Sequence, residues 1–263
     1  RRNHEERDPP QASPQSGAVR RIQEGVNLAT TGGTVNVTAG TYQENVVVNH
    51  RVRIIGTQNV FFAPDTFIST ATIGGNAITI SADGLAGVGN ALEIQNIHCQ
   101  GKTTDILNNN DYGINVTVPA YYLNLYNVYA DNYRFAGLIF NGTYSAGTPA
   151  FINIWDCQFQ GCDLGINLGL GMNGLDIRRG LIKNNRYVGL ITAGSDSQIL
   201  NNLSIDGTAF EDNGTGGLAL STFAADIFLQ RFNGSALRTN LSFNTYAATA
   251  LDLRGRGPLH SPA

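Results

Sequence analysis

Residues 152–192, INIWDCQFQGCDLGINLGLGMNGLDIRRGLIKNNRYVGLIT, contain one structural unit almost twice. Each copy begins with an apolar-x-apolar strand, at Ile152 or Leu175, and continues through a small turn into a second short strand. Each then reaches a glycine, Gly165 or Gly189, that is followed by a third short, mostly apolar run. One unit of three short strands cannot bury its own inward side chains, so the pattern predicts units that stack on one another.

The unit recurs along the chain. The glycines that precede its third strand are spaced alternately by 24 and 28 residues, and they are Gly113, Gly137, Gly165, Gly189 and Gly217. Side chains alternate between the two faces of a strand, so the first strand of each unit should add to one inward apolar column. We expect this column to contain Leu123, Ile152, Leu175 and Leu203. Asn, Asp and Gly at the turns favour the left-handed backbone that tight corners need.

These repeats predict an all-β fold, a single right-handed parallel β-helix over residues 19–255. A short amino-terminal capping helix is expected over residues 19–30, because the apolar residues of this segment follow one another at spacings of three and four. Residues 1–18 are polar and contain prolines, which predicts an arm, and residues 256–263 form a tail. Exposed strand edges at the carboxy-terminal end predict contact between subunits there, with the arm as a candidate participant.

The first coil carries a recognisable motif. Residues 22–56 contain G-T-Y-x-E at Gly40, Thr41, Tyr42 and Glu44, and this segment resembles the opening coil of pectate-lyase-like right-handed β-helices. The resemblance implies the fold over most of the chain but no particular reaction. The sequence lacks the Q-D-T-L and D-F-I-F-G strings of pectin methylesterases, the N-T-D, D-D and R-I-K strings of polygalacturonases, and the calcium-binding aspartates with R-x-P-x-x-R of pectate lyases. The resemblance therefore assigns no catalytic residue.

Composition argues against several classes of function. The 17 basic and 20 acidic residues give a net charge of −3, so no positive field attracts nucleic acid. Charged residues make up only 14% of the chain, which suits an extracellular β protein. No apolar run is long enough to span a membrane, and the start at Arg1 without a signal segment predicts a processed product. We therefore expect a secreted or cell-surface protein.

The cysteines form no C-x-x-C motif, so the sequence predicts no metal site, no cofactor and no dependence on disulfides. Cys99 and Cys157 fall at inward positions and should be small core side chains, whereas Cys162, beside a turn, is expected to be more exposed. Seven N-x-S/T sequons make glycosylation a hypothesis. Their asparagines are Asn36, Asn115, Asn141, Asn202, Asn213, Asn233 and Asn240.

Alignment of the units predicts an outward column that combines aromatic and charged side chains. It contains Tyr126, Trp155, Arg178 and Asp206, beside a second outward column of Asn124, Asn153, Asp176 and Ser204. Tyr126 and Trp155 are candidates for carbohydrate binding, because aromatic rings stack on sugars while neighbouring polar groups bind hydroxyls. The alternative is that a loop or a partner subunit covers these rings.

Carboxylates on adjacent coils are candidates for catalysis. A glycosidase-type pair needs two carboxylates roughly 5–10 Å apart, and Asp131 and Glu211 lie three coils apart in a further outward column, Asp131, Gln160, Lys183 and Glu211. Asp176 and Asp206 lie on adjacent coils and are the better pair, with Arg178 beside them. Charges that alternate along such a ladder can also serve only to solvate the face. His50 and His98 lie outside any ligand spacing and receive no role.

Two functions fit the sequence. The first is an extracellular structural or adhesive β-helix that self-associates through its ends or its arm, because complete catalytic motifs are lacking and most connections are short. The second is a protein that binds or degrades polysaccharide on the face from Tyr126 to Asp206. Whether the chain is an enzyme stays open; an enzyme of this kind would be a polysaccharide lyase or a glycoside hydrolase.

Overall fold

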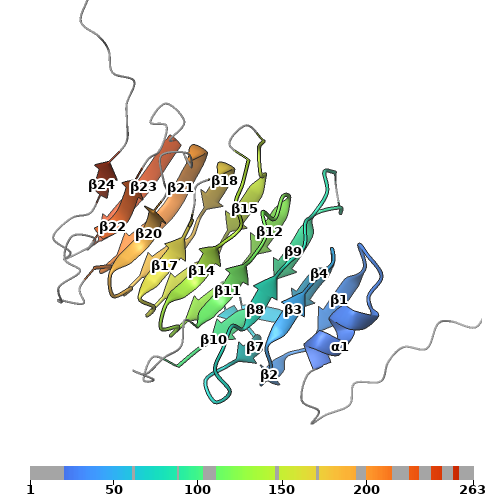
Figure 1. Cartoon of the computed structure of the whole chain (residues 1–263). Coiled ribbons are helices and arrows are strands. Elements are labelled where there is room, and N and C mark those ends of the chain that lie inside the picture. Colours follow the sequence, from blue (N-terminus) through green and yellow to red (C-terminus); the bar gives the residue numbers. More distant parts are fainter. Residues whose placement is uncertain are drawn as a thin grey trace, which may run out of the picture.

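A computed structural model describes the chain over residues 21–60, 63–87, 89–102, 111–145, 148–169, 172–193, 200–214, 225–230, 238–244 and 251–254. Within these residues it contains one helix and 24 strands. The long strand ladders pair in parallel and wind as coils around one core, a right-handed parallel β-helix (Figure 1). The predicted fold class is therefore confirmed. The predicted arm and tail lie outside the described residues.

Three faces of the solenoid are formed by three ladders of strands. The first ladder is β1 (Thr34–Val37), β4 (Arg53–Gly56), β9 (Leu92–Gln95), β12 (Leu123–Tyr126), β15 (Ile152–Trp155), β18 (Asn173–Arg178) and β21 (Asn201–Glu211). The second is β2 (Gly40–Tyr42), β7 (Thr66–Ser69), β10 (His98–Gln100), β13 (Tyr129–Asp131), β16 (Gln158–Gln160) and β19 (Leu181–Lys183). The long β21 pairs with both β18 and β19, and β23 (Arg238–Asn244) follows it, so these two ladders join at this end.

The third ladder completes each coil. It consists of β3 (Val46–Val48), β8 (Ile78–Ile80), β11 (Tyr112–Val116), β14 (Ala136–Phe140), β17 (Leu164–Asn167), β20 (Val188–Ala193), β22 (Ala225–Gln230) and β24 (Leu251–Arg254). A small antiparallel hairpin, β5 (Gln58–Val60) and β6 (Ala63–Pro64), leaves the second coil after β4. No helix among the described residues has the length and hydrophobicity needed to cross a bilayer.

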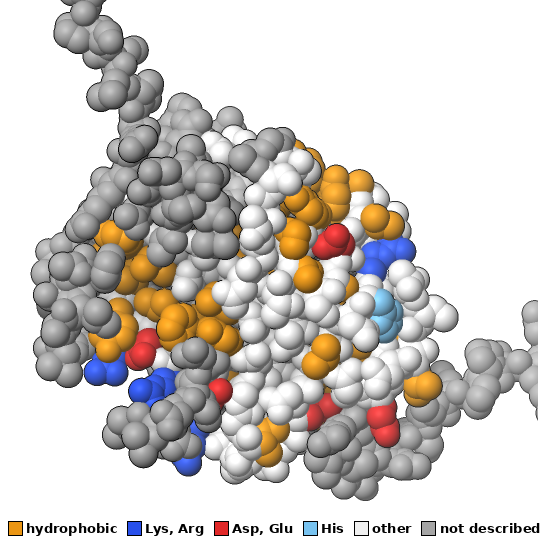
Figure 2. Space-filling model, in the orientation of Figure 1, with side chains coloured by type: hydrophobic (Ala, Val, Ile, Leu, Met, Phe, Trp, Pro, Cys, Tyr) orange, Lys and Arg blue, Asp and Glu red, His pale blue; other side chains and the backbone are white. Residues whose placement is uncertain are grey.

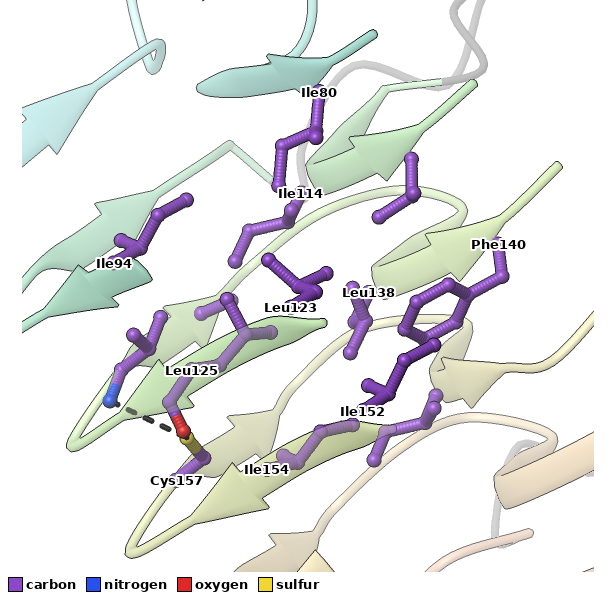
Figure 3. Close-up of a cluster of buried hydrophobic side chains, with 14 of the residues drawn as sticks. Ile80, Ile94, Ile114, Leu123, Leu125, Leu138, Phe140, Ile152, Ile154 and Cys157 are labelled. Carbon is purple, nitrogen blue, oxygen red and sulfur yellow. Dashed lines mark hydrogen bonds between the residues drawn. The ribbon is translucent and has the colours of Figure 1, made fainter. Parts of the chain in front are cut away.

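The core confirms the predicted inward column. Leu123, Ile152, Leu175 and Leu203 are buried and follow one another in register. Figure 3 shows how such side chains from successive coils fill the interior, with Leu123, Ile152 and Leu138 pointing toward one another from two ladders. Cys157 points into this core, and all three cysteines are free and buried. The expectation that Cys162 is more exposed was wrong, since it is only 2% exposed.

The predicted glycine column is correct for four coils and wrong for the fifth. Strand register aligns Gly113, Gly137, Gly165 and Gly189. The next strand of this ladder is β22, and it places Asp226 opposite Gly189, where the sequence pattern predicts Gly217. Asp226 is buried and accepts hydrogen bonds from Asn213. A hydrogen-bonded polar side chain therefore replaces glycine at this position of the coil.

The amino-terminal helix α1 (Arg21–Leu28) caps the solenoid as predicted (Figure 1). It buries Ile22 and Val26 against the first coil. Glu44, the last residue of the G-T-Y-x-E motif, is buried and accepts hydrogen bonds from the backbone N–H groups of Ile22 (3.0 Å) and Gln23 (3.1 Å). A carboxylate at a helix amino terminus satisfies unpaired N–H groups and the helix dipole. The motif thus fixes the cap to the first coil.

Candidate functional site

The outward face of the first ladder brings the predicted aromatic and charged column together. Register pairs Tyr126 with Trp155, Trp155 with Arg178, and Arg178 with Asp206. The neighbouring column, Asn124, Asn153, Asp176 and Ser204, is also in register. Both columns exist because strand side chains alternate between the core and the outside while coils repeat without a shift. We call Tyr126, Trp155, Arg178 and Asp176 the aromatic row.

Planar groups of the aromatic row contact one another across three coils. The ring centroids of Tyr126 and Trp155 lie 5.4 Å apart with an interplanar angle of 45°. The Arg178 guanidinium lies over the Trp155 ring, 5.1 Å from its centroid, in a cation–π arrangement. Burial, and to a lesser degree the nearby Glu93 carboxylate, raises the pKa of Tyr126, so its hydroxyl stays protonated and able to donate.

Asp176 connects the charged end of the row to its aromatic centre. Its Oδ2 accepts a hydrogen bond from Trp155 Nε1 (3.2 Å) and lies 2.7 Å from Arg178 Nε in an ion pair. Its Oδ1 is buried without a hydrogen-bond partner. The Arg178 side chain is 44% exposed, whereas that of Asp176 is 19% exposed. Asp206 is exposed on the next coil.

The further outward column, which begins at Asp131, is in register as predicted. It also contains a contact between a histidine and a carboxylate that the sequence did not suggest. Asp131, Gln160, Lys183 and Glu211 follow one another, and Asp131 Oδ2 lies 3.3 Å from Nε2 of His98 on the preceding coil. The His98 ring packs between Phe67 (4.7 Å) and Tyr129 (4.5 Å). Sequence patterns assign His98 no role, because its partner lies one coil away and only the register between coils reveals it.

His50 has a structural role on the surface beside the cap. Its Nε2 lies 3.0 Å from the carbonyl oxygen of Ala29, and its Nδ1 lies 2.8 Å from Asn49 Oδ1. No group of three or more His, Cys, Asp or Glu side chains that could hold a metal ion occurs among the described residues.

The sequons differ in accessibility. Asn36, Asn141 and Asn202 are exposed, and Asn115 is 9% exposed. Asn213 is fully buried, and its Nδ2 donates to Asp226 Oδ1 (2.8 Å) and to the carbonyl oxygen of Ile182 (2.9 Å). A glycan on that nitrogen is incompatible with the fold, so Asn213 was wrong as a candidate. The side chains of Asn233 and Asn240 lie outside the described part of the structure.

Comparison with known proteins finds distant likenesses among solved structures. No protein-family model and no curated protein matches the sequence. Among solved structures, the chain is similar to the pectin methylesterase from Aspergillus niger in a penultimately deglycosylated form, with 12% identity, 95% of this chain and 89% of that chain covered, and a TM-score of 0.44. The deglycosylated form of that enzyme gives 13% identity, 94% and 88% coverage, and a TM-score of 0.41. By its own strand pairing, this chain is a right-handed parallel β-helix.

Proposed function

We propose that this protein binds a polysaccharide on the outward face of its first ladder. The observation that carries the proposal is the aromatic row, in which Tyr126, Trp155 and Arg178 stand in register on three adjacent coils. Aromatic rings supply apolar area for the faces of sugars, while a guanidinium and a carboxylate supply hydrogen bonds to hydroxyl or carboxyl groups. The row combines both within one continuous surface.

The rest of the face is suited to a polar, weakly charged polymer. Asn124 and Asn153 lie outward beside the row, and Asn153 Nδ2 donates to Asn124 Oδ1 (2.9 Å). Side-chain amides both donate and accept hydrogen bonds, as a hydroxyl-rich ligand requires. Charged residues make up only 14% of the chain, and most of the face seen in Figure 2 is uncharged. A polysaccharide fits this surface better than a highly charged polymer does.

A more specific version of the proposal is that the protein also degrades the bound polysaccharide, as a lyase or a glycoside hydrolase. The reacting groups would then be Asp176, Asp206 and Arg178. Its support is that Asp176 lies in contact with the proposed sugar-binding rings and has one unpartnered carboxylate oxygen. A secreted or cell-surface location, with glycans on the exposed sequons, accords with such a ligand.

The competing function is a structural or adhesive protein that self-associates. The arm of residues 1–18, which was the predicted candidate participant in this association, lies outside the described residues. The same aromatic row could then be a contact between subunits, since aromatic and Arg side chains are also enriched at protein interfaces.

One experiment tests the proposal and separates the two functions. Trp155 is the only tryptophan in the sequence, so its fluorescence reports directly on the row. We expect one or more members of a panel of acidic and neutral polysaccharides to change this fluorescence with a saturable dependence on concentration. If none binds, and Trp155→Ala instead dissociates an oligomer in light scattering, the row is a subunit interface and the proposed function is wrong.

A further inference from the structure

A second pair of aromatic rings lies on the same face of the molecule, at the corner where the chain enters the first ladder. Tyr122 and Phe151 directly precede β12 and β15, and their rings stack with centroids 4.9 Å apart and an interplanar angle of 11°. Phe151 is 50% exposed, which makes it one of the few large apolar side chains in the described structure that solvent reaches. We call Tyr122 and Phe151 the corner pair.

The backbone of the corner pair is unusual for aromatic residues. Both residues have a φ of 53°, in the left-handed region. Bulky side chains are rare there, whereas Gly and Asn adopt this conformation readily. The next two coils have Gly174 and Asn202 at the corresponding corner, also with positive φ. Two aromatic rings therefore occupy a position at which a smaller residue would fold with less strain, and such outliers point to function.

On the coil after Phe151, the residue in register with Phe151 is a glycine. No side chain from that position covers this side of the corner pair. Gly174 is the residue opposite Phe151, and a Cβ added to it would be in ordinary contact with the backbone N of Phe151, 3.5 Å away. Successive coils are about 4.8 Å apart, close to the distance at which rings stack. A ring placed over Gly174 would thus lie against Phe151 on one side. On its other side would be the exposed Asn202, whose Nδ2 donates to Asn173 Oδ1 (2.6 Å).

The corner pair is aligned with the aromatic row. Tyr122 precedes Tyr126 by four residues on one coil, and Phe151 precedes Trp155 by four residues on the next. Four residues of strand span about 13 Å, which an oligosaccharide of a few sugar rings can bridge. The outward side chains between the two pairs are the amides of Asn124 and Asn153.

We propose that the corner pair is a second sugar-binding platform, which stacks on a pyranose ring of the same polysaccharide chain that contacts the aromatic row. The chain would then lie along the strands of the first ladder, across the axis of the solenoid. This inference rests on the proposed function and adds to it the direction of the bound chain and the position of its second contact.

The test is the dependence of affinity on ligand length, measured by calorimetry with cello-oligosaccharides and oligogalacturonides from the disaccharide to the hexasaccharide. Phe151→Asn removes the ring and places at φ 53° a residue that tolerates this conformation, so the fold should be retained. Phe151→Tyr keeps a ring and is the matched control. If Phe151→Asn lowers the melting temperature, Phe151→Gly replaces it.

We expect Phe151→Asn to weaken hexasaccharide binding by roughly threefold to tenfold and to leave disaccharide binding unchanged. Trp155→Ala should weaken both, and Phe151→Tyr neither. Unchanged hexasaccharide affinity in Phe151→Asn, together with a loss in Trp155→Ala, would overturn the second platform and leave the proposed function standing. The reverse pattern would support the corner pair and overturn the aromatic row, and absence of binding to both series by the wild type would overturn both.

Discussion

Trp155 Nε1 donates a hydrogen bond of 3.2 Å to Asp176 Oδ2, and this bond joins two adjacent coils through outward side chains. The same oxygen is paired with Arg178, whose guanidinium lies over the Trp155 ring. The indole is therefore held in one orientation by a hydrogen bond at its edge and a cation at its face. A rigid ring loses little conformational entropy when it binds a ligand, which is why Trp155 is the centre of the proposed site.

Trp155→Ala and Tyr126→Ala should each weaken polysaccharide binding by about 1–3 kcal/mol, or roughly tenfold to a hundredfold, because each removes the apolar area of an aromatic anchor. Calorimetry against the polysaccharide that binds best provides the measurement. Phe135→Ala is the control, since Phe135 packs edge-on against Tyr112 at 5.4 Å, away from the first ladder. Equal losses in all three variants would show that binding depends on general stability and not on this row.

Asp176→Asn and Asp206→Asn should abolish turnover of the bound polysaccharide and leave its binding largely intact. An amide keeps the shape of the carboxylate but loses its charge and its capacity for proton transfer. The amide oxygen in Asp176→Asn would still accept from Trp155 Nε1, and loss of the ion pair with the partly exposed Arg178 should change stability by only about 0–1 kcal/mol. Product release is followed by assays for reducing ends and for unsaturated ends. Wild-type rates in both variants would exclude these carboxylates from the chemistry.

Gly165→Val should destabilise the solenoid by about 3 kcal/mol and lower the melting temperature by roughly 5–10 °C. The reason is close approach between coils: a Cβ at this position would lie 2.8 Å from Asn185 Nδ2, 2.8 Å from Ile182 Cγ2, and closer still to the carbonyl oxygen of Gly189. Gln95→Val, at an outward strand position, places the same side chain where a large one already fits and serves as the control. A melting temperature unchanged by Gly165→Val would mean that the register is wrong.

Much of this fold can be predicted from the sequence because β-helix coils repeat with little insertion. The spacing of short strands was enough to place Tyr126 opposite Trp155 and Asn124 opposite Asn153, as the register shows. The pattern failed where a polar residue replaces the repeating one. A search for glycine before an apolar run selects Gly217, whereas the coil uses Asp226, which is accommodated by its hydrogen bonds to Asn213.

Contacts between coils were the least predictable part of the candidate site. Pairing of His98 with Asp131 depends on the exact offset of two strands that are separated by a long connection. The corner pair is equally hidden, since a Tyr or Phe before a strand gives no sign of a left-handed backbone, and residues of that size seldom adopt it. Side-chain packing between coils therefore needs the three-dimensional structure.

Asn213→Ala should lower stability by about 2–4 kcal/mol, because it removes several buried hydrogen bonds and leaves their partners unsatisfied. Asn213 Oδ1 accepts from Asn185 Nδ2 at 2.8 Å and from the Asn185 backbone N at 3.1 Å, while its Nδ2 donates to Asp226 and Ile182. Asn36→Ala, at an exposed strand position, should stay within about 0.5 kcal/mol of the wild type. Urea unfolding of the two variants gives the measurement. Equal unfolding midpoints would contradict a stabilising role for the hydrogen bonds of Asn213.

The buried cysteines predict a specific dependence of stability on pH. Burial raises the pKa values of Cys157 and Cys162 to about 12 and that of Cys99 further, whereas an unfolded thiol titrates near roughly 8.5. Above that pH the unfolded chain loses thiol protons that the folded chain keeps, so the free energy of unfolding should be fully retained below about pH 8 and fall as pH rises from there toward 12. Replacing Cys157 and Cys162 by Ala should lower stability at neutral pH but make this alkaline decrease shallower, which melting temperatures between pH 7 and 10 would show.

The folded wild type should also resist alkylation at pH 8 and react once it is unfolded, because the thiolate is the reactive species. Fast alkylation of the native protein, or an identical alkaline decrease in the Ala variants, would contradict burial of these thiols.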